Sequence, residues 1–143
     1  MAYWLFQANP TYYRILDAIR DLETMPWLVT RYKTLIQPDD GVLIWVAGAN
    51  AGIYAIATIT SLPTVLDTEQ ISDLDYWTDH KRLREDKPRT TVQFIRKLLG
   101  QPLRKGELRY DRTLRDLPVI LTPSSTNFKI TPDQWQRVHQ LKG

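Results

Sequence analysis

The sequence contains no cysteine. This absence excludes disulfides, thiol nucleophiles, redox-active dithiols and thiolate metal sites. A chain of 143 residues buries about two thirds of its unfolded surface on folding, so it needs no covalent crosslinks. We therefore expect one domain, spanning residues 1–143, that is stabilised by an apolar core.

Histidine is scarce, and catalytic motifs are missing. The two histidines, His80 and His139, lie far apart in the sequence and form no local pair of metal ligands. Ser124 and Ser125 lie in a predicted loop with no nearby base to activate them. The motifs G-x-S-x-G, G-x-x-x-x-G-K-[ST] and G-x-G-x-x-G do not occur. The sequence therefore predicts no catalytic residues, no metal site and no cofactor.

Charge is absent from residues 41–66, GVLIWVAGANAGIYAIATITSLPTVL. A run of this length could cross a bilayer, for which about 20 apolar residues suffice. Its Val, Ile, Thr and aromatic residues instead favour strands, and its central GANAG is typical of a turn. We predict core strands over residues 42–47 and 53–62, joined by a five-residue hairpin loop. Residues 1–6 lack a basic targeting leader, so we expect a cytoplasmic protein without membrane contact.

The remaining sequence predicts strands and helices in mixed order. Strands are predicted over residues 2–7 and 90–99, an extended segment over 28–35, and helices over 10–22 and from Pro132 onward. The first helix is expected to start at Asn9-Pro10, and the last follows the capping box Thr131-Pro132-Asp133-Gln134. The chain shows no internal repeat.

The adjacent carboxylates Asp39 and Asp40 have the composition of an acid–base pair. They fall, however, in the run Gln37-Pro38-Asp39-Asp40-Gly41, in which Asp side chains bond their own backbone and Gly permits positive φ. Neighbouring side chains on a turn do not converge on one substrate. We interpret these residues as a turn.

The net charge of +3 conceals a division between the two halves of the chain. Through residue 78 there are four Lys or Arg and nine Asp or Glu, a balance of −5, whereas from Asp79 onward there are fifteen and seven, a balance of +8. If these basic residues share a face, they form an electrostatic footprint for a polyanion such as nucleic acid. The alternative is an ordinary solvated basic surface.

Aromatic residues are abundant, with five Trp and seven Tyr. Trp4, Trp45 and Trp135 lie within predicted strands and helices, where large aromatic side chains mostly fill the core. Trp27 and Trp77 instead lie at breaks between predicted elements, and a pair of loop aromatics can sandwich a planar base. For Trp27 the alternative is a lid on the core.

Two segments resemble the EVE-domain family. Residues 41–57 resemble its centre, GD-x-V-L-I-W-x-S-G-x-x-x-G-I-x-A-x-G, and residues 126–135, TNFKITPDQW, resemble its closing T-N-F-x-[VI]-T-x-x-x-W. Tyr3-Trp4, Gln7-Ala8-Asn9-Pro10 and Trp27 with Arg31 fit the same family. The resemblance covers essentially the whole chain. It departs at Ala47, which replaces Ser, and at Ala57, which replaces Gly.

The resemblance implies an α+β fold, a PUA-like open β-barrel of mixed strands flanked by helices, which is shared with YTH readers of methylated adenine in RNA. It also implies a non-catalytic module that holds a modified base of DNA or RNA in an aromatic pocket. The residues it assigns to that pocket are Asn9, Trp27, Gly48, Ala49, Asn50, Asn127 and Phe128. Asn9 is also the expected helix cap.

Further binding residues are expected outside these motifs. Trp77 is a possible additional aromatic at the pocket, and Lys81, Arg82 and Arg84 are candidate phosphate-binding residues.

A protein-interaction or scaffold domain, whose exposed aromatics meet a partner chain, is the main alternative function. An enzyme acting on a modified nucleotide is a third, and it would require a carboxylate or His within reach of the pocket.

Overall fold

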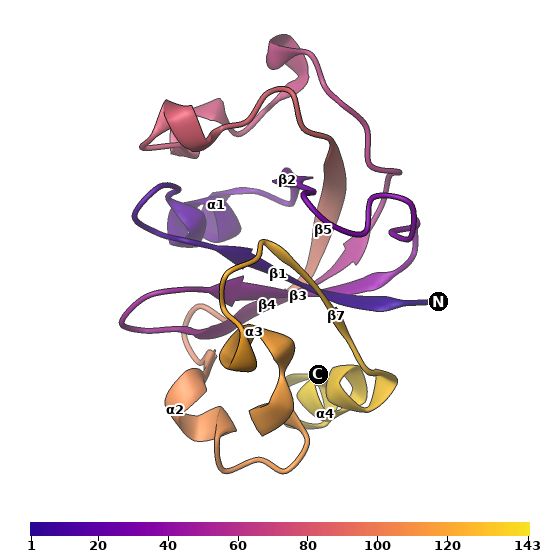
Figure 1. Cartoon of the computed structure of the whole chain (residues 1–143). Helices are drawn as coiled ribbons and strands as arrows, with labels where there is room; N and C mark the ends of the chain where they lie inside the picture. The colour runs from indigo at the N-terminus through magenta and orange to yellow at the C-terminus, as the bar shows by residue number, and fades with distance from the viewer.

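A curved seven-stranded sheet organises the computed structural model, which describes residues 1–143 (Figure 1). Its strands are β1 (Tyr3–Ala8), β2 (Thr24–Leu28), β3 (Gly41–Val46), β4 (Gly52–Ile59), β5 (Arg89–Lys97), β6 (Leu103–Arg104) and β7 (Asn127–Ile130). The strand order is β2-β5-β4-β3-β1-β7, and β6 pairs with β4 beside this path. Only β1 and β3 pair in parallel, and the other pairs are antiparallel.

Helices lie on both sides of this sheet. They are α1 (Ile15–Asp21), α2 (Lys105–Leu108), α3 (Pro118–Leu121) and α4 (Pro132–Lys142), with the 3-10 turns η1 (Thr68–Gln70), η2 (Leu74–Tyr76), η3 (His80–Arg82) and η4 (Leu114–Asp116). Figure 1 shows α1 and the long connection between β4 and β5 on one side of the sheet, and α2, α3 and α4 on the other.

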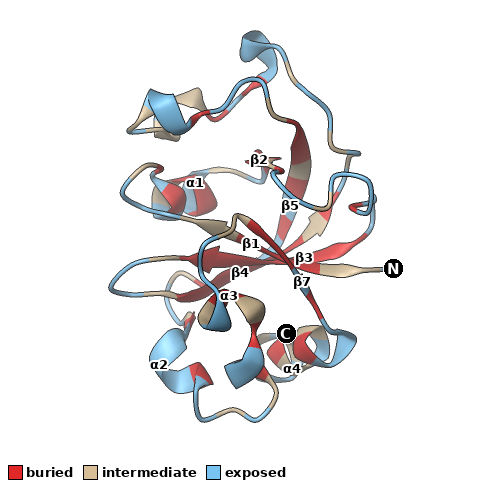
Figure 2. Cartoon of the chain, in the orientation of Figure 1, coloured by how far each residue is buried: buried red, intermediate tan, exposed pale blue.

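Two apolar cores follow from the covering of both faces. In β1, Trp4 and Phe6 belong to the core under α1, whereas Leu5 belongs to the core under α4, because successive strand residues point to opposite faces. All six residues of β3 are buried (Figure 2). A central strand that is covered on both faces must be apolar throughout, which explains the uncharged run at residues 41–66. No helix has the length and apolarity needed to span a membrane.

Most predicted strands are confirmed. The structure differs from prediction at the helix expected over residues 10–22 and at the extended segment expected over residues 28–35. The predicted helix over residues 10–22 begins only at Ile15, because residues 10–12 form a turn in which the carbonyl of Asn9 accepts the backbone N–H of Tyr12 and Tyr13. The extended segment predicted over residues 28–35 is wrong: β2 ends at Leu28 and irregular backbone follows. Pro26 lies inside β2, which is tolerated because β2 is an edge strand.

The last helix and the core tryptophans agree with prediction. Thr131 and Gln134 form both hydrogen bonds of the capping box at the start of α4. Trp4 and Trp45 are buried, and Trp135 is partly buried with its ring stacked on Tyr3, 5.0 Å between centroids.

The turn before β3 is confirmed, but its two carboxylates have different roles. Asp39 is exposed and adopts a φ of 74°, whereas Asp40 is buried. Oδ1 of Asp40 accepts the backbone N–H of Ala2 at 3.1 Å, and Oδ2 accepts the indole N–H of Trp4 at 2.9 Å and the backbone N–H of Gln37 at 3.0 Å. Asp40 therefore ties the start of β1 to the turn that precedes its parallel partner.

Gly41 follows Asp40 for a reason other than the predicted positive φ. It is the first residue of β3, and the indole of Trp135 lies directly against it. A Cβ atom at this position would lie 2.5 Å from Cη2 of Trp135, closer than real contacts allow. Packing of α4 on the sheet therefore requires glycine here.

We predict that Asp40→Asn destabilises the fold, whereas Asp39→Asn does not. The amide places an NH₂ group where one carboxylate oxygen stood, so at least one buried N–H loses its acceptor, at about 1–3 kcal/mol for each unsatisfied group. Asp39 is exposed and Asn tolerates positive φ, so its variant should lie within about 0.5 kcal/mol of the parent. Urea unfolding measures both, and equal midpoints for the two variants would contradict the role of Asp40.

Candidate functional site

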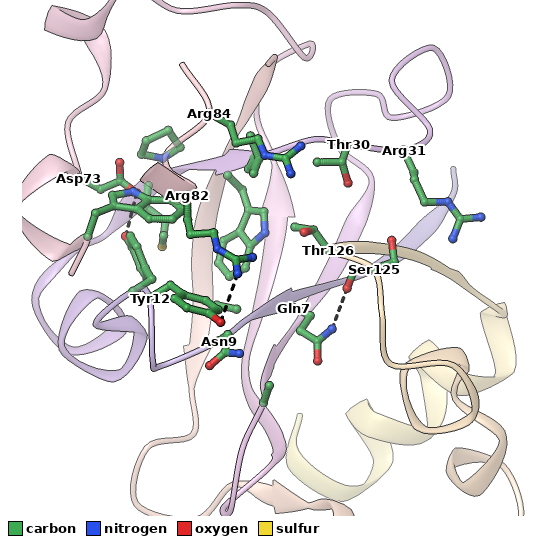
Figure 3. A pocket seen from close by; sticks show the side chains of 18 of the residues that line it. Gln7, Asn9, Tyr12, Thr30, Arg31, Asp73, Arg82, Arg84, Ser125 and Thr126 are labelled. Carbon is green, nitrogen blue, oxygen red and sulfur yellow. Dashed lines mark hydrogen bonds between the residues drawn. The ribbon is translucent and has the colours of Figure 1, made fainter. Parts of the chain in front are cut away.

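An open cavity of about 750 Å³ lies between the end of β1, strand β2, the connection around residues 73–84 and the segment 123–126 (Figure 3). It is the larger of the two principal cavities. Its position at the end of the parallel pair β1–β3 brings together side chains from four distant parts of the chain.

Aromatic side chains form one wall of the cavity. Trp27 projects from β2, is only 4% exposed, and packs against Phe6 with 5.9 Å between ring centroids. Trp77 is partly buried and meets Tyr13 edge to face at 4.9 Å. Tyr12 also lines the cavity. Trp27 therefore belongs both to the core under α1 and to the cavity wall.

Three exposed arginines, Arg31, Arg82 and Arg84, line the rim, and none of them forms an ion pair. The guanidinium of Arg82 lies 4.2 Å from the ring centroid of Tyr12 and donates to its hydroxyl at 3.3 Å. Figure 3 shows Arg82 and Arg31 projecting from opposite sides of the cavity, with Arg84 between them. The rim is therefore positively charged on more than one side.

Two buried polar side chains, Tyr13 and Asp73, also line the cavity. Tyr13 donates its hydroxyl to Oδ2 of Asp73 at 2.8 Å. Burial raises the pKa of Asp73, and the hydrogen bond from Tyr13 and the charge of Arg89 oppose that rise in part. Burial, followed by the neighbouring Asp73, raises the pKa of Tyr13 far above its usual range, and burial lowers that of Arg89. The hydroxyl of Tyr13 therefore stays protonated at neutral pH.

Trp77 packs against Tyr13 of this pair. Its Nε1 atom and Oδ1 of Asp73 are both buried and form no hydrogen bond within the protein. No set of three or more His, Cys, Asp or Glu side chains is placed to hold a metal ion.

Arg89 holds the backbone of one rim segment. It is the first residue of β5 and is 2% exposed. Its guanidinium donates to the carbonyl oxygen of Arg84 at 3.1 Å and also to that of Leu83. The segment that carries Arg82 and Arg84 is thus anchored to the sheet by a buried cation.

Asn127 holds the backbone of the opposite rim segment. It is fully buried at the start of β7. Its Oδ1 accepts the backbone N–H of Thr30 at 2.8 Å, and its Nδ2 donates to the carbonyl of Leu28 at 3.1 Å. Asn127 was expected to line the pocket, but the structure places it behind the wall, where it orients the backbone between Trp27 and Arg31.

The structure separates the other expected pocket residues. Asn9 and Trp27 line the cavity, as do Trp77, Arg82 and Arg84. Phe128 does not, because it points to the opposite face of the sheet and is buried in the core under α4. The loop residues Gly48, Ala49 and Asn50 are exposed beyond the cavity, which only the preceding Ala47 lines. Lys81 is exposed next to Arg82 and does not line the cavity.

Asn9 lines the cavity as expected, but it is not the predicted cap of the first helix. Its Oδ1 accepts the backbone N–H of Thr11 at 2.9 Å and so stabilises the turn after β1, not the start of α1, whose N-cap is Arg14. Its side chain nevertheless lies at the cavity (Figure 3). The amide Nδ2 makes no hydrogen bond within the protein and is available as a donor.

Sequence reasoning missed Gln7, Tyr12, Asp73 and the segment 123–126 as lining residues. Nε2 of Gln7 donates to the carbonyls of Pro123 at 3.0 Å and Ser125 at 2.7 Å, which holds this segment across the end of β1 (Figure 3). Two of these could have been predicted from their positions in the sequence. Segment 123–126 directly precedes β7, and Tyr12 lies three residues after Asn9.

Comparisons with known proteins agree on the fold. A hypothetical protein from Leishmania major has a TM-score of 0.72 at 16% identity, covering 99% of this chain and 94% of its own. Human THYN1 in complex with DNA containing 5-methylcytosine has a TM-score of 0.71 at 14% identity, covering 99% and 97%. A Pseudomonas putida protein has a TM-score of 0.70 at 21% identity, covering 98% and 99%.

No curated protein sequence matches the chain. A family model described as EVE domain, however, matches residues 2–141. The match covers nearly the whole chain, and the structural neighbours share its curved mixed sheet with flanking helices. The chain belongs to the EVE-domain family and has the PUA-like α+β fold that its two motifs imply.

Proposed function

We propose that this EVE domain binds a modified base of DNA or RNA in the cavity beside Trp27, without altering it. The observation that carries this proposal is an aromatic wall surrounded by three unpaired guanidinium groups. Such a combination suits a planar base that is attached to a phosphate backbone. A cavity of about 750 Å³ also falls within the size range of small-ligand sites, about 300–1,000 Å³.

The aromatic wall would hold the base by stacking. Trp27 offers a ring fixed by packing on Phe6, and Trp77 offers a second ring fixed by Tyr13. Stacking of a base on an aromatic side chain contributes about 1–3 kcal/mol and tolerates any base. Discrimination must then come from the polar groups near the base edge, of which the free Nδ2 of Asn9 is one.

The rim would hold the phosphates on either side of the base. Guanidinium groups bind phosphate oxygens through paired hydrogen bonds, and these rim arginines have no carboxylate partner to release first. Arg82 and Arg31 project from opposite sides of the cavity (Figure 3), which fits a strand that enters on one side and leaves on the other. Lys81, next to Arg82, would reach phosphates farther out.

Binding without chemistry fits the titratable groups at the cavity. Asp73 and Tyr13 are buried and hydrogen-bonded to each other, and the raised pKa of Tyr13 keeps its hydroxyl protonated. A catalytic base needs a free, accessible proton acceptor, whereas the free oxygen of Asp73 is buried. We therefore infer that Tyr13 and Asp73 support the aromatic wall.

Methylated cytosine is the first ligand to test, because human THYN1, which shares this fold, was captured with DNA containing 5-methylcytosine. Matched oligonucleotides carrying 5-methylcytosine, N6-methyladenine or no modification are compared, as DNA and as RNA. The comparison distinguishes binding of a modified base from general nucleic-acid binding. Tighter binding of at least one modified oligonucleotide is expected. Equal affinity for all modified and unmodified oligonucleotides at low salt would refute base reading.

We predict that Trp27→Leu weakens binding of the preferred modified oligonucleotide. Leu keeps an apolar side chain in the core but has no ring face for stacking, so affinity should fall roughly 5- to 150-fold. Trp135→Leu is the matched control, because Trp135 lies on the other side of the sheet and should leave affinity unchanged. Fluorescence anisotropy measures affinity and circular dichroism verifies folding. A folded Trp27→Leu variant with parental affinity would contradict the stacking role.

Salt dependence distinguishes this function from a protein-interaction domain. Each phosphate contact contributes about 0.7 to the slope of log K against log salt for a single strand. Arg82→Gln together with Arg84→Gln should therefore reduce that slope by about 1.4. Lys142→Gln, near the far end of α4, should leave it unchanged. No binding of any of these oligonucleotides at low salt would instead favour the scaffold alternative.

We predict that Asn127→Ala lowers both stability and affinity. The substitution leaves the N–H of Thr30 and the carbonyl of Leu28 without their partner, at about 1–3 kcal/mol each. The loosened backbone would also release Trp27 and Arg31 from their positions. Gln136→Ala, at an exposed position of α4, is the control. Thermal unfolding tests the effect on stability, and affinity measured below the transition tests the effect on binding. An unchanged melting temperature would contradict the role of Asn127 in holding this backbone.

A further inference from the structure

A second basic surface lies on the other side of the sheet from α1. We call residues 104–115, RKGELRYDRTLR, the basic segment; it runs through α2 to η4. Its five cationic side chains are all exposed and none forms an ion pair: Arg104, Lys105, Arg109, Arg112 and Arg115. Of its two acidic residues, Asp111 is already bound by Arg137 at 2.8 Å.

The hairpin loop connects the basic segment to the cavity. Gly52 pairs with Arg104, and the backbone N–H of Lys105 donates to the carbonyl of Ala51 at 2.8 Å. A Cβ atom on Gly52 would lie 2.4 Å from the carbonyl oxygen of Leu103, so the two backbones are in close contact. At the other end of the loop, Ala47 lines the cavity. The loop therefore bridges the two sites.

The hairpin loop between the two sites is uncharged. The exposed residues of the loop, Gly48, Ala49 and Asn50, carry no charge and little bulk. Figure 1 shows η3, the turn after β1, the hairpin loop and α2 following one another along one side of the molecule. A polyanion leaving the rim at Arg82 would thus cross neutral surface and then meet unpaired cations.

An exposed aromatic residue lies within the basic segment. Tyr110 is 79% exposed, and the guanidinium of Arg109 lies 5.0 Å from its ring centroid and donates to its hydroxyl at 3.1 Å. An aromatic ring among unpaired cations is typical of surfaces that bind single-stranded nucleic acid, where bases stack and cations bind the backbone. Tyr110 makes the segment more than a solvated charge cluster.

We propose that the strand whose modified base occupies the cavity continues across the hairpin loop, and that its phosphates bind the basic segment. This inference rests on the proposed function for its starting point. It assigns to the domain a second contact with the nucleic-acid backbone, several nucleotides from the base that is read. It also gives the loop residues 48–50 a role as the path between the two sites.

The test compares oligonucleotide lengths. The double variant Arg104→Ser, Lys105→Gln removes two cations, and Ser is a favoured residue at the N-cap position that Arg104 occupies. Single-stranded DNA with one 5-methylcytosine is the probe, either about 4 or about 20 nucleotides long, which bracket known footprints on single-strand binding domains. Lys129→Gln, Lys142→Gln is the control, with the same change of charge near α4.

On the long probe the double variant should bind roughly tenfold more weakly than the control at low salt, with a salt slope smaller by about 1.4. On the short probe the two variants should bind equally. Equal affinity and equal slope on the long probe would overturn the inference, whatever the preference for 5-methylcytosine. Circular dichroism confirms that both variants are folded.

The position of the base in the probe tests the path. With 5-methylcytosine at either the 5′ or the 3′ end of the long probe, only one orientation directs the strand across the loop, so only one should be sensitive to the double variant. Equal sensitivity of both would overturn a directed path. An unmodified long probe separates the proposals: weaker binding by the double variant without any modified-base preference would refute base reading and retain the second surface.

Discussion

The cavity depends on buried polar side chains that hold irregular backbone against the sheet. Loop backbone has no ladder to satisfy its N–H and C=O groups, so each buried group needs a partner from elsewhere. Asn127 supplies it to the segment after β2, Arg89 to the segment that carries the rim arginines, and Gln7 to segment 123–126. All three belong to sheet strands. The geometry of the site is therefore inherited from the most rigid part of the molecule.

The same ties explain why sequence predicted the fold better than the site. Strands β3 and β4 are readable from an uncharged, β-branched run, because burial on both faces is a local compositional requirement. The ties are long-range: Asn127 meets a backbone N–H 97 residues away. The family motif includes Asn127, yet no local pattern shows that its amide faces backbone behind the wall. Segment 123–126 carries no periodic signal at all.

The charge division along the chain also acquires a different meaning in three dimensions. The basic half does not form one face. Arg82 and Arg84 lie at the rim, five further cations lie in residues 104–115 beyond the hairpin loop, and Arg89 is buried as a support. Total charge therefore overstates the number of groups free to meet a polyanion. The hairpin loop between these two surfaces carries no charge.

Trp27 belongs to the core and to the cavity wall at once. Its indole cannot be exchanged for another side chain without disturbing the packing around Phe6, whereas Asn9, Thr30 and Ser124 are exposed at the edge of the cavity. A substitution at this edge would therefore change the lining of the cavity and leave the packing around Phe6 intact.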